Sequence, residues 1–370
     1  MPLLVYTRFE NKPQLFSGPE KIISCHEPAG LKTAFDSMER ALKMGYFLAG
    51  FVSYEAGYGM EDSLAACCSK NGFPLLMFGC YKPPKSAKYV FNAQFRLANI
   101  TTSIPFEDYK RDIDAIRAHI AAGDVYQITY CLKQKFNFEG SGISLFTQLL
   151  REQPVPYPAY IKTNEFEILS LSPEMFLKKK GNILTTKPMK GTWPRGANPV
   201  SDLAARFRLK YDPKNRAENV MIADLLRNDL GRIGSGVRVE RLFEVSGYRT
   251  LYQMTSTVSA KTGPETGLYS IFSSLLPSGS VTGAPKIRAM QIIRGMEREE
   301  RKIYTGAIGY ITPERDMFFN VPIRTILLQD GRGEMGVGGG IIWDSTPHGE
   351  WDEGMLKSKF LTDLSFNKPT

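Results

Sequence analysis

The sequence predicts an α+β fold in which large sheets are accompanied by helices. Strand-like segments are numerous and long, and helices do not alternate with them regularly, as they would in a doubly wound parallel sheet. The composition, 42% hydrophobic and 23% charged, supplies ample apolar residues for a sizeable core. A chain of 370 residues exceeds the usual size of one domain, so one large domain or two fused lobes are expected.

Apolar residues at helical spacing predict four helices. The first covers residues 31–42, and the second begins at Phe106 and is ended by Gly123. The third is amphipathic and covers residues 215–227, and the last begins near Glu350.

Strand-like segments are short apolar runs bounded by turn residues. They are expected at residues 46–54, 75–81, 89–97, 125–137, 160–162, 167–177, 183–187, 305–312, 318–328 and 335–343. Pro83-Pro84 and the polar residues after them look like a linker. Residues 1–97 are therefore interpreted as a short N-terminal region that contributes to the same two-lobed fold as the rest of the chain.

The net charge of +9 could favour binding of nucleic acid, a membrane surface or an anionic metabolite. The basic residues are scattered, and the densest run, Lys178–Lys180, lies beside Gly181-Asn182, which is typical of a solvated hairpin turn. The sequence contains no nucleic-acid-binding motif, so nucleic acid is not an expected partner.

The cysteines and the N-terminal sequence indicate in which cellular compartment the protein is expected. Five cysteines, an odd number without CxxC spacing, argue against a disulfide framework or a zinc site and fit a reducing cytosol. The first residues lack the apolar run of a signal peptide, and no stretch approaches the length of a membrane span. A soluble, cytoplasmic protein with no membrane partner is expected.

Glu218 is an unusual residue of the third helix. It precedes Ile222 by four residues, so its carboxylate is predicted to lie on the apolar, inward face. A carboxylate there needs a partner, either a metal ion or a basic side chain such as Arg216 or Arg232. The residues by themselves leave both interpretations open.

The C-terminal helix carries a similar stripe of charge. Glu350, Glu353 and Lys357 lie at i, i+3 and i+7, which is also the pattern of an exposed, salt-bridged face. This helix follows the glycine run at residues 336–340, and glycines in a strand often mark a close approach of a ligand to the backbone. Two helices could thus offer carboxylates to one Mg²⁺ ion, which takes one or two protein carboxylates and keeps water and substrate oxygens.

Lys190 lies between Pro188 and Gly191, with the hydroxyl of Thr192 nearby. A lysine at a strand end is usually a solvated surface residue. It becomes a nucleophile only when neutral, which requires desolvation or nearby cations to lower its pKa. The local sequence does not establish that environment.

Glu174 and Arg324 each have two interpretations. Glu174 follows Pro173 in a mostly apolar strand-like stretch, so it is either a general acid with a raised pKa or an edge residue facing water. Arg324 is a guanidinium embedded in a predicted strand. It would suit bidentate capture of a carboxylate or a structural ion pair.

Together these segments resemble the chorismate-utilising enzymes, a family that includes anthranilate synthase component I, aminodeoxychorismate synthase component I, isochorismate synthase and salicylate synthase. The resemblance covers residues 106–364, which it makes a chorismate-binding catalytic domain, and it implies an anthranilate synthase component I-like fold with large antiparallel sheets flanked by helices. The motifs that carry it are Gly123-Asp-Val-Tyr-Gln127, Ser172-Pro-Glu174, Pro188-Met-Lys-Gly-Thr192, Arg216-Ala-Glu-Asn219, Asp224-Leu-Leu-Arg-Asn-Asp-Leu-Gly-Arg232, Gly279-Ser-Val-Thr-Gly-Ala-Pro-Lys286, Tyr304-Thr-Gly306, Ile323-Arg-Thr325, Gly338-Gly-Gly340 and Glu350-Trp-Asp-Glu353 with Lys357.

The resemblance implies a Mg²⁺ site and a site for each carboxylate of chorismate. Glu218 and Glu353 would be the metal ligands, with Glu350 near the metal through water. The metal would hold the ring carboxylate, and the residues that would help it are Gly191, Thr192 and Lys357. The enolpyruvyl carboxylate would be held by Tyr304, Arg324 and backbone amides around Gly338 and Gly339.

Two positions distinguish members of the family. Members that use water as nucleophile carry a lysine where this chain has Gln127, so their chemistry is disfavoured. Anthranilate synthases typically have alanine at the position of Lys190, whereas aminodeoxychorismate synthases have lysine. The implied route is attack of Lys190 on C2 of chorismate with Glu174 as general acid, followed by addition of ammonia at C4. One departure from the family pattern is Ser278, at a place usually held by glycine.

No cysteine lies in the sequence context of a glutaminase nucleophile, so ammonia is expected from a separate glutamine amidotransferase subunit in a weak heterodimer. Two alternatives remain at this point. One is an anthranilate synthase component I, and the other is a catalytically silent chorismate-binding subunit. The intact set of Glu174, Lys190, Glu218 and Glu353 argues against a silent subunit.

Overall fold

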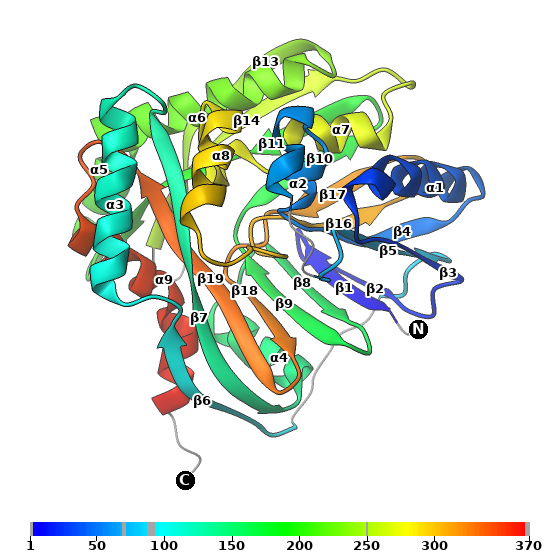
Figure 1. Cartoon of the computed structure of the whole chain (residues 1–370), viewed down its shortest axis with the longest axis horizontal. Helices are drawn as coiled ribbons and strands as arrows, with labels where there is room; N and C mark the ends of the chain where they lie inside the picture. The colour runs from blue at the N-terminus through cyan, green and yellow to red at the C-terminus, as the bar shows by residue number, and fades with distance from the viewer. Residues whose placement is uncertain (1–2, 69–71, 87–92, 249–250, 367–370) are drawn as a thin grey trace.

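The computed structural model describes residues 3–68, 72–86, 93–248 and 251–366, and these form two large antiparallel sheets packed face to face (Figure 1). Helices cover the outer face of each sheet, so the layers are helix, sheet, sheet, helix. This arrangement confirms the predicted class, large antiparallel sheets flanked by helices.

The first sheet, sheet A, has nine strands within the described residues. Its order is β15 (Gly283–Ala284), β7 (Gln127–Gly140), β19 (Arg332–Ile341), β18 (Thr325–Gln329), β9 (Phe166–Ser172), β8 (Tyr157–Lys162), β1 (Leu4–Phe9) and β2 (Lys12–Phe16), with β6 (Phe95–Thr102) also paired to β7.

The second sheet, sheet B, has ten strands within the same part of the chain. Its order is β12 (Met189–Pro194), β14 (Leu251–Lys261), β11 (Ile183–Lys187), β10 (Met175–Lys180), β17 (Met317–Asn320), β16 (Ala307–Ile311), β4 (Phe47–Val52), β5 (Leu76–Tyr81) and β3 (Lys21–Cys25), with β13 (Ser235–Gly247) also paired to β14.

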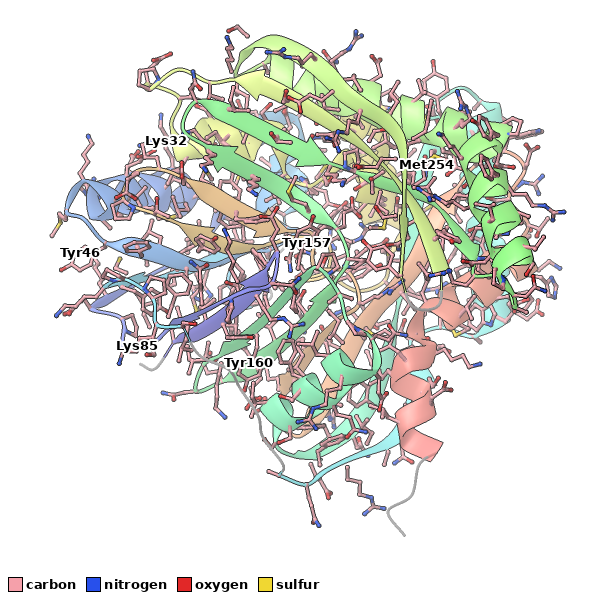
Figure 2. All side chains as sticks on the ribbon, turned by 180° about the vertical axis from the view of Figure 1, so that it is seen from behind. Lys32, Tyr46, Lys85, Tyr157, Tyr160 and Met254 are labelled. Carbon is pink, nitrogen blue, oxygen red and sulfur yellow. The ribbon has the colours of Figure 1, made fainter. Side chains whose placement is uncertain are left out.

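Three apolar clusters hold the layers together. The cluster between the sheets combines residues of β1, β8 and β9 with residues of β4, β16 and β17, among them Val5, Ile161 and Phe51. Tyr157 of β8 packs on Phe318 of β17, with ring centroids 5.8 Å apart, where strands of the two sheets meet (Figure 2). The cluster outside sheet B involves α1 (Leu31–Lys43), α6 (Pro213–Gly231) and α7 (Leu268–Leu275). The cluster outside sheet A involves α3 (Phe106–Ala121), α4 (Gly142–Glu152), α8 (Lys286–Met296) and α9 (Pro347–Phe366).

The N-terminal strands are shared between the two sheets. Strands β1 and β2 extend sheet A through the pairing of β1 with β8, and β3, β4 and β5 extend sheet B through the pairing of β4 with β16. Within the described residues, no helix is long and apolar enough to cross a membrane.

Two of the strands predicted from the sequence are each divided into two strands, and the two halves belong to different sheets. The run predicted at 167–177 is β9 in sheet A followed by β10 in sheet B, and the run predicted at 318–328 is β17 in sheet B followed by β18 in sheet A. Pro173 and Pro322 stand at the two breaks, and proline supplies no N–H for a strand ladder. Both strands of each pair are buried, so the apolar run continues through the break and its hydrophobic pattern does not reveal it.

Other differences concern segments that the sequence assigned only in part or not at all. The strand predicted at 89–97 lies partly outside the described residues, and the described strand β6 runs from Phe95 to Thr102. The sequence did not predict β1 to β3, α4, the helix α5 (Pro199–Tyr211), β13, β14, α7 or α8. Strand β2 contains Lys12 and Pro13 among its five residues, and β13 is half exposed along its length, so neither shows a clean period of two.

Candidate active site

The chain crosses from one sheet to the other between β9 and β10 and again between β17 and β18, and these two connections lie side by side. Glu174 is in the β9–β10 crossing, and its carbonyl accepts a hydrogen bond from Val321 N at 3.1 Å. Arg324 ends the β17–β18 crossing, and its carbonyl accepts one from Leu171 N, also at 3.1 Å. The chain therefore brings an acidic and a basic residue to the line where the two sheets separate.

Glu174 is a buried carboxyl group, with 3% of its surface exposed. Its Oε1 accepts a hydrogen bond from the Ser280 hydroxyl at 2.6 Å and a longer one from Met189 N at 3.4 Å. Burial raises the pKa of Glu174 to about 7, although the Ser280 hydrogen bond and the charge of Lys190 oppose that rise. A carboxyl group in this state can act as a general acid near neutral pH.

Lys190 lies within β12 rather than at its end, and the residue as a whole is half-buried. Burial of the amine lowers the pKa of Lys190, Glu218 opposes this effect and Lys357 adds to it. The backbone is held by Asn219, whose Nδ2 donates to the Lys190 carbonyl at 3.3 Å. The desolvation that the sequence could not establish is therefore present.

Gln127 and Lys190 meet at the backbone of Gly340 on β19. A Cβ added to Gly340 would lie 1.9 Å from Nε2 of Gln127 and 3.0 Å from Nζ of Lys190. Gln127 is 1% exposed, and neither Nε2 nor Oε1 has a hydrogen-bond partner among the residues that the structure describes. A buried amide without partners is costly unless a ligand or a bound water satisfies it, so this amide indicates a binding site.

The neighbouring glycine, Gly339, faces the charged stripe of α9. A Cβ at Gly339 would lie 3.0 Å from Oε2 of Glu350, 3.5 Å from Nζ of Lys357 and 4.0 Å from Oε1 of Glu353. Lys357 forms an ion pair with Glu353 at 2.7 Å and donates to the Gly338 carbonyl at 2.9 Å. The stripe thus faces the glycine strand, although the side chain of Glu353 remains 57% exposed.

The pKa values of the two carboxyl groups of this stripe are shifted in opposite directions. Burial raises the pKa of Glu350, against the effect of a 2.6 Å hydrogen bond from the Ser345 hydroxyl. Glu353 is also partly buried, but the charge and hydrogen bond of Lys357 outweigh that burial and hold its pKa below the usual value. Glu353 is therefore ionised, as a ligand of a cation must be.

Glu218 is half-buried on α6, whose fully buried neighbours are Asn219 and Ile222. Of the two basic partners considered from sequence, Arg216 lies over the ring of Phe243 and Arg232 is exposed. The charge of Glu218 acts on Lys190 instead. Across residues 3–68, 72–86, 93–248 and 251–366, no three His, Cys, Asp or Glu side chains are grouped closely enough to bind one metal ion by themselves.

The structure corrects the expected setting of Arg324. It does not lie in a strand, because it is the residue before β18 and has a left-handed backbone with φ of 51°. Burial lowers the pKa of Arg324, and Tyr248 opposes this effect. The connection is joined to the segment of Tyr304 by a hydrogen bond from Thr305 N to the Pro322 carbonyl at 3.0 Å.

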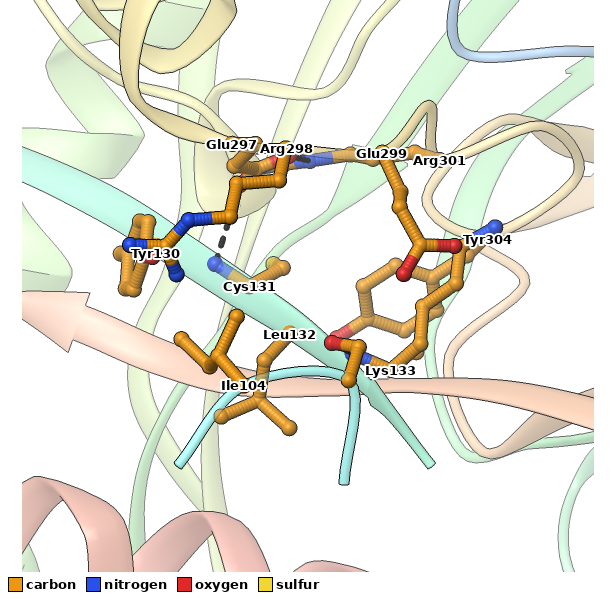
Figure 3. Close-up of a pocket in the computed structure, with 12 residues that line it drawn as sticks. Ile104, Tyr130, Cys131, Leu132, Lys133, Glu297, Arg298, Glu299, Arg301 and Tyr304 are labelled. Atoms are coloured by element: carbon orange, nitrogen blue, oxygen red, sulfur yellow. Dashed lines mark hydrogen bonds and ion pairs between the residues drawn. The ribbon is translucent and has the colours of Figure 1, made fainter. Parts of the chain in front are cut away.

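Tyr304 lines a small pocket shown in Figure 3. A Cβ on Gly336 would lie 2.3 Å from its ring, and its hydroxyl shares a hydrogen bond with Cys131. The pocket also holds the ion pair of Arg301 with Glu297, at 2.6 Å. Lys190, Glu174 and Gln127 are not in its walls, so this pocket adjoins the site at Tyr304 and is not the catalytic centre.

Gly191 and Thr192 continue β12 beyond Lys190. Gly191 has φ of 99°, a conformation that favours glycine, and a Cβ there would lie 3.0 Å from Oδ1 of Asn215. Thr192 is exposed and is opposite Gln253 of β14.

Ser280 and Asn219 are site residues that the sequence did not single out individually. Both lie inside segments recognised as family motifs, so these motifs were the sequence feature from which the two residues could have been identified. Their roles depend on contacts with Glu174 and Lys190, which are far from them along the chain.

The fold and the arrangement of these residues are those expected of a chorismate-utilising enzyme. Comparison with known proteins gives the same class. Residues 82–363 match the family described as chorismate binding enzyme. This chain therefore belongs to the chorismate-binding enzyme family.

Relatives with two different names match this chain almost equally. It is 36% identical over 272 residues to aminodeoxychorismate synthase component 1 of Klebsiella aerogenes, covering 73% of this chain and 59% of that protein. It is 34% identical over 257 residues to anthranilate synthase component 1 of Pseudomonas putida, covering 69% and 52%. The matches thus span little more than half the length of these relatives.

A solved structure shares the whole fold. Anthranilate synthase component I from Streptococcus pneumoniae superposes with a TM-score of 0.77 at 23% identity, covering 97% of this chain and 90% of that one. At this identity the likeness supports the fold alone.

Proposed function

We propose that this chain aminates chorismate at C4 with ammonia and forms 4-amino-4-deoxychorismate. The observation that carries the proposal is that Lys190 and Glu174 are two buried reactive groups close enough for the charge of each to act on the other. Burial favours the neutral form of both groups, which for the lysine is the nucleophilic amine and for the glutamate is the proton-donating acid.

The proposed reaction has two displacement steps. In the first, Nζ of Lys190 bonds to C2 of chorismate, both ring double bonds shift by one position and the C4–O bond breaks, while Glu174 protonates the departing hydroxyl so that it leaves as water. In the second, ammonia bonds to C4, both double bonds shift back and the bond from C2 to Nζ breaks. The new ammonium group then returns a proton to Glu174, and both residues recover their starting state.

Gln127 supports ammonia rather than water as the second nucleophile. An amide cannot take a proton from water, whereas ammonia is nucleophilic without a base. The amide of Gln127 lies beside Nζ of Lys190 at Gly340 and has free donor and acceptor atoms for a ligand.

Glu218, Glu350 and Glu353 suit one Mg²⁺ ion. Two helices, α6 and α9, direct them toward Lys190 and Gly339, and Mg²⁺ takes only one or two protein carboxylates beside water and substrate oxygens. The lack of a closed three-residue cluster is compatible with such an open site. When bound, the ion would neutralise the ring carboxylate of chorismate, with Lys357, Gly191 and Thr192 beside it.

Arg324, Tyr304 and the backbone around Gly338 are proposed to hold the enolpyruvyl carboxylate. A partly buried guanidinium without a paired carboxylate among the described residues suits an anionic group. The ammonia is proposed to come from a separate glutamine amidotransferase.

A product analysis tests the proposal. The purified chain is incubated with chorismate, Mg²⁺ and ammonium, and the products are separated and identified by mass. Aminodeoxychorismate without release of pyruvate is the expected result. Anthranilate with pyruvate would establish the rival activity of the relatives named anthranilate synthase. Absence of turnover, even with amidotransferases added, would indicate a chorismate-binding subunit without catalysis.

A further inference from the structure

Three buried side chains form a hydrogen-bonded chain behind the active site. The Ser280 hydroxyl donates to Oε1 of Glu174 at 2.6 Å, and the hydroxyls of Ser278 and Ser280 are 3.0 Å apart. Glu174, Ser278 and Ser280 are each 3–4% exposed. Only Glu174 has a role in the reaction proposed above.

The donors around Glu174 distinguish its two oxygens. Oε1 receives the hydroxyl hydrogen of Ser280 and, at 3.4 Å, the amide hydrogen of Met189. A proton on Oε1 would point at these donors, so the proton of the neutral acid belongs on Oε2. Because Ser280 gives its only hydrogen to Glu174, Ser278 must be the donor in the contact between the two serines.

We propose that Ser280, oriented by Ser278, is a positioning residue that keeps the proton of Glu174 on Oε2 for delivery to the leaving hydroxyl. This inference rests on the function proposed above, because it concerns the acid of that reaction. The departing oxygen receives the proton from Oε2, and Oε1 keeps its hydrogen bond from Ser280 before and after the transfer.

The backbone that carries the two serines is fixed. Thr282 Oγ1 donates to the Ser278 carbonyl at 3.1 Å, and Arg301 Nη1 donates to the Val281 carbonyl at 2.8 Å. Gly279 packs on α6 so closely that a Cβ there would lie 2.5 Å from Cδ2 of Leu225. A rigid turn with a buried hydroxyl suits a positioning role.

The charge of Lys190 on β12 acts on Glu174, and the charge of Glu174 in turn adds slightly to the rise in the pKa of Tyr157 on β8. The hydrogen bond from Ser280 stabilises the ionised form of Glu174 and so limits the rise of its pKa that burial causes. Removing the hydroxyl should therefore raise the pKa of Glu174 further.

The test titrates Glu174 directly, in full-length protein labelled with ¹³C at the glutamate carboxyl groups, with its signal assigned by Glu174→Gln. In Ser280→Ala the pKa of Glu174 should rise by about one pH unit, the typical effect of one lost charge-assisted hydrogen bond. kcat should fall roughly three- to tenfold while KM for chorismate is unchanged. Ser280→Thr should restore both values, and Ser278→Ala should give a smaller change in the same direction.

Ser274→Ala is the matched control. Ser274 is equally buried, but its hydroxyl donates to the Asp229 carbonyl at 2.6 Å and not to a catalytic group. An unchanged Glu174 titration in Ser280→Ala, or equal shifts in Ser280→Ala and Ser274→Ala, would overturn the proposal. The titration needs no turnover, so it remains readable if the product analysis contradicts amination at C4.

Discussion

The side-chain amide of Gln127 packs against the Cα of Gly340, and a Cβ on this glycine would lie 1.9 Å from Nε2 of Gln127. Within the described part of the chain, both polar atoms of this buried amide lack hydrogen-bond partners. Gln127→Met keeps the length of the side chain and removes the unpaired groups. We expect it to raise the free energy of unfolding by about 1–3 kcal/mol and to lower turnover at least tenfold.

Chemical denaturation and steady-state kinetics measure these two opposite effects. Gln134→Met is the control, because Gln134 is buried on the same strand β7 and its Oε1 also lacks a partner, but its Nε2 contacts Met355 on α9. It should leave turnover unchanged. A Gln127→Met variant with full turnover would show that the amide has no part in the reaction.

Lys190→Ala should lower amination by about a hundredfold or more, because it removes the proposed nucleophile. Incubation of the wild-type protein with chorismate, without ammonia, should give a covalent adduct that intact-protein mass spectrometry detects. The adduct should be absent from Lys190→Ala. Lys187→Ala is the control, since the ammonium group of Lys187 forms its ion pair with Glu244, at 2.9 Å. An adduct on Lys190→Ala would assign the nucleophile elsewhere.

The rate should pass through a maximum with pH. Activity rises with pH as Lys190, whose pKa is lowered by burial, loses its proton, and falls as Glu174 ionises through its pKa of about 7. The measurement is kcat against pH, from about 5.5 to about 9, at a constant concentration of free ammonia. Glu174→Gln should remove the falling limb and lower kcat about a hundredfold. A falling limb that persists in Glu174→Gln would assign it to another group.

Removal of a proposed metal ligand should weaken the response to Mg²⁺. Glu218→Gln should raise the Mg²⁺ concentration for half-maximal activity at least tenfold, because a neutral amide is a poorer ligand than a carboxylate. Asp224→Asn serves as the control on the same helix, since Asp224 is 62% exposed and pairs with Arg227. Equal Mg²⁺ dependence of Glu218→Gln and the wild type would contradict a ligand role for Glu218.

A buried ion pair between Lys286 and Asp229 ties α8 to α6. Lys286→Met should destabilise the protein by about 3–5 kcal/mol, because it leaves the Asp229 carboxylate buried without its cation. Thermal or chemical unfolding measures this loss. The double variant Lys286→Met/Asp229→Asn should recover part of the stability, and a double variant no more stable than Lys286→Met would contradict this cause.

The sequence predicted four of the helices and the long central strands, but it missed α4 and α7, although both have a clear apolar face. The helices at α1, α3, α6 and α9 have regular apolar or charged spacing, and the central strands are long apolar runs. The edge strands β2 and β3 and the half-exposed β13 carry mixed residues, because one side of each faces solvent, and their pattern was too weak to predict them.

By itself, the sequence determined the fold class and the family, because these depend on residue types at fixed spacing along the chain. It also predicted the reactive residues. Only the tertiary structure decided how Lys190 and Glu174 differ from surface residues. Their pKa values depend on burial by strands of both sheets, and Gln127, Ser280 and Gly340 reach them from segments far apart in the chain. The placement of Arg324 was also decided by the fold, because an apolar run looks the same whether a strand continues or crosses to the other sheet.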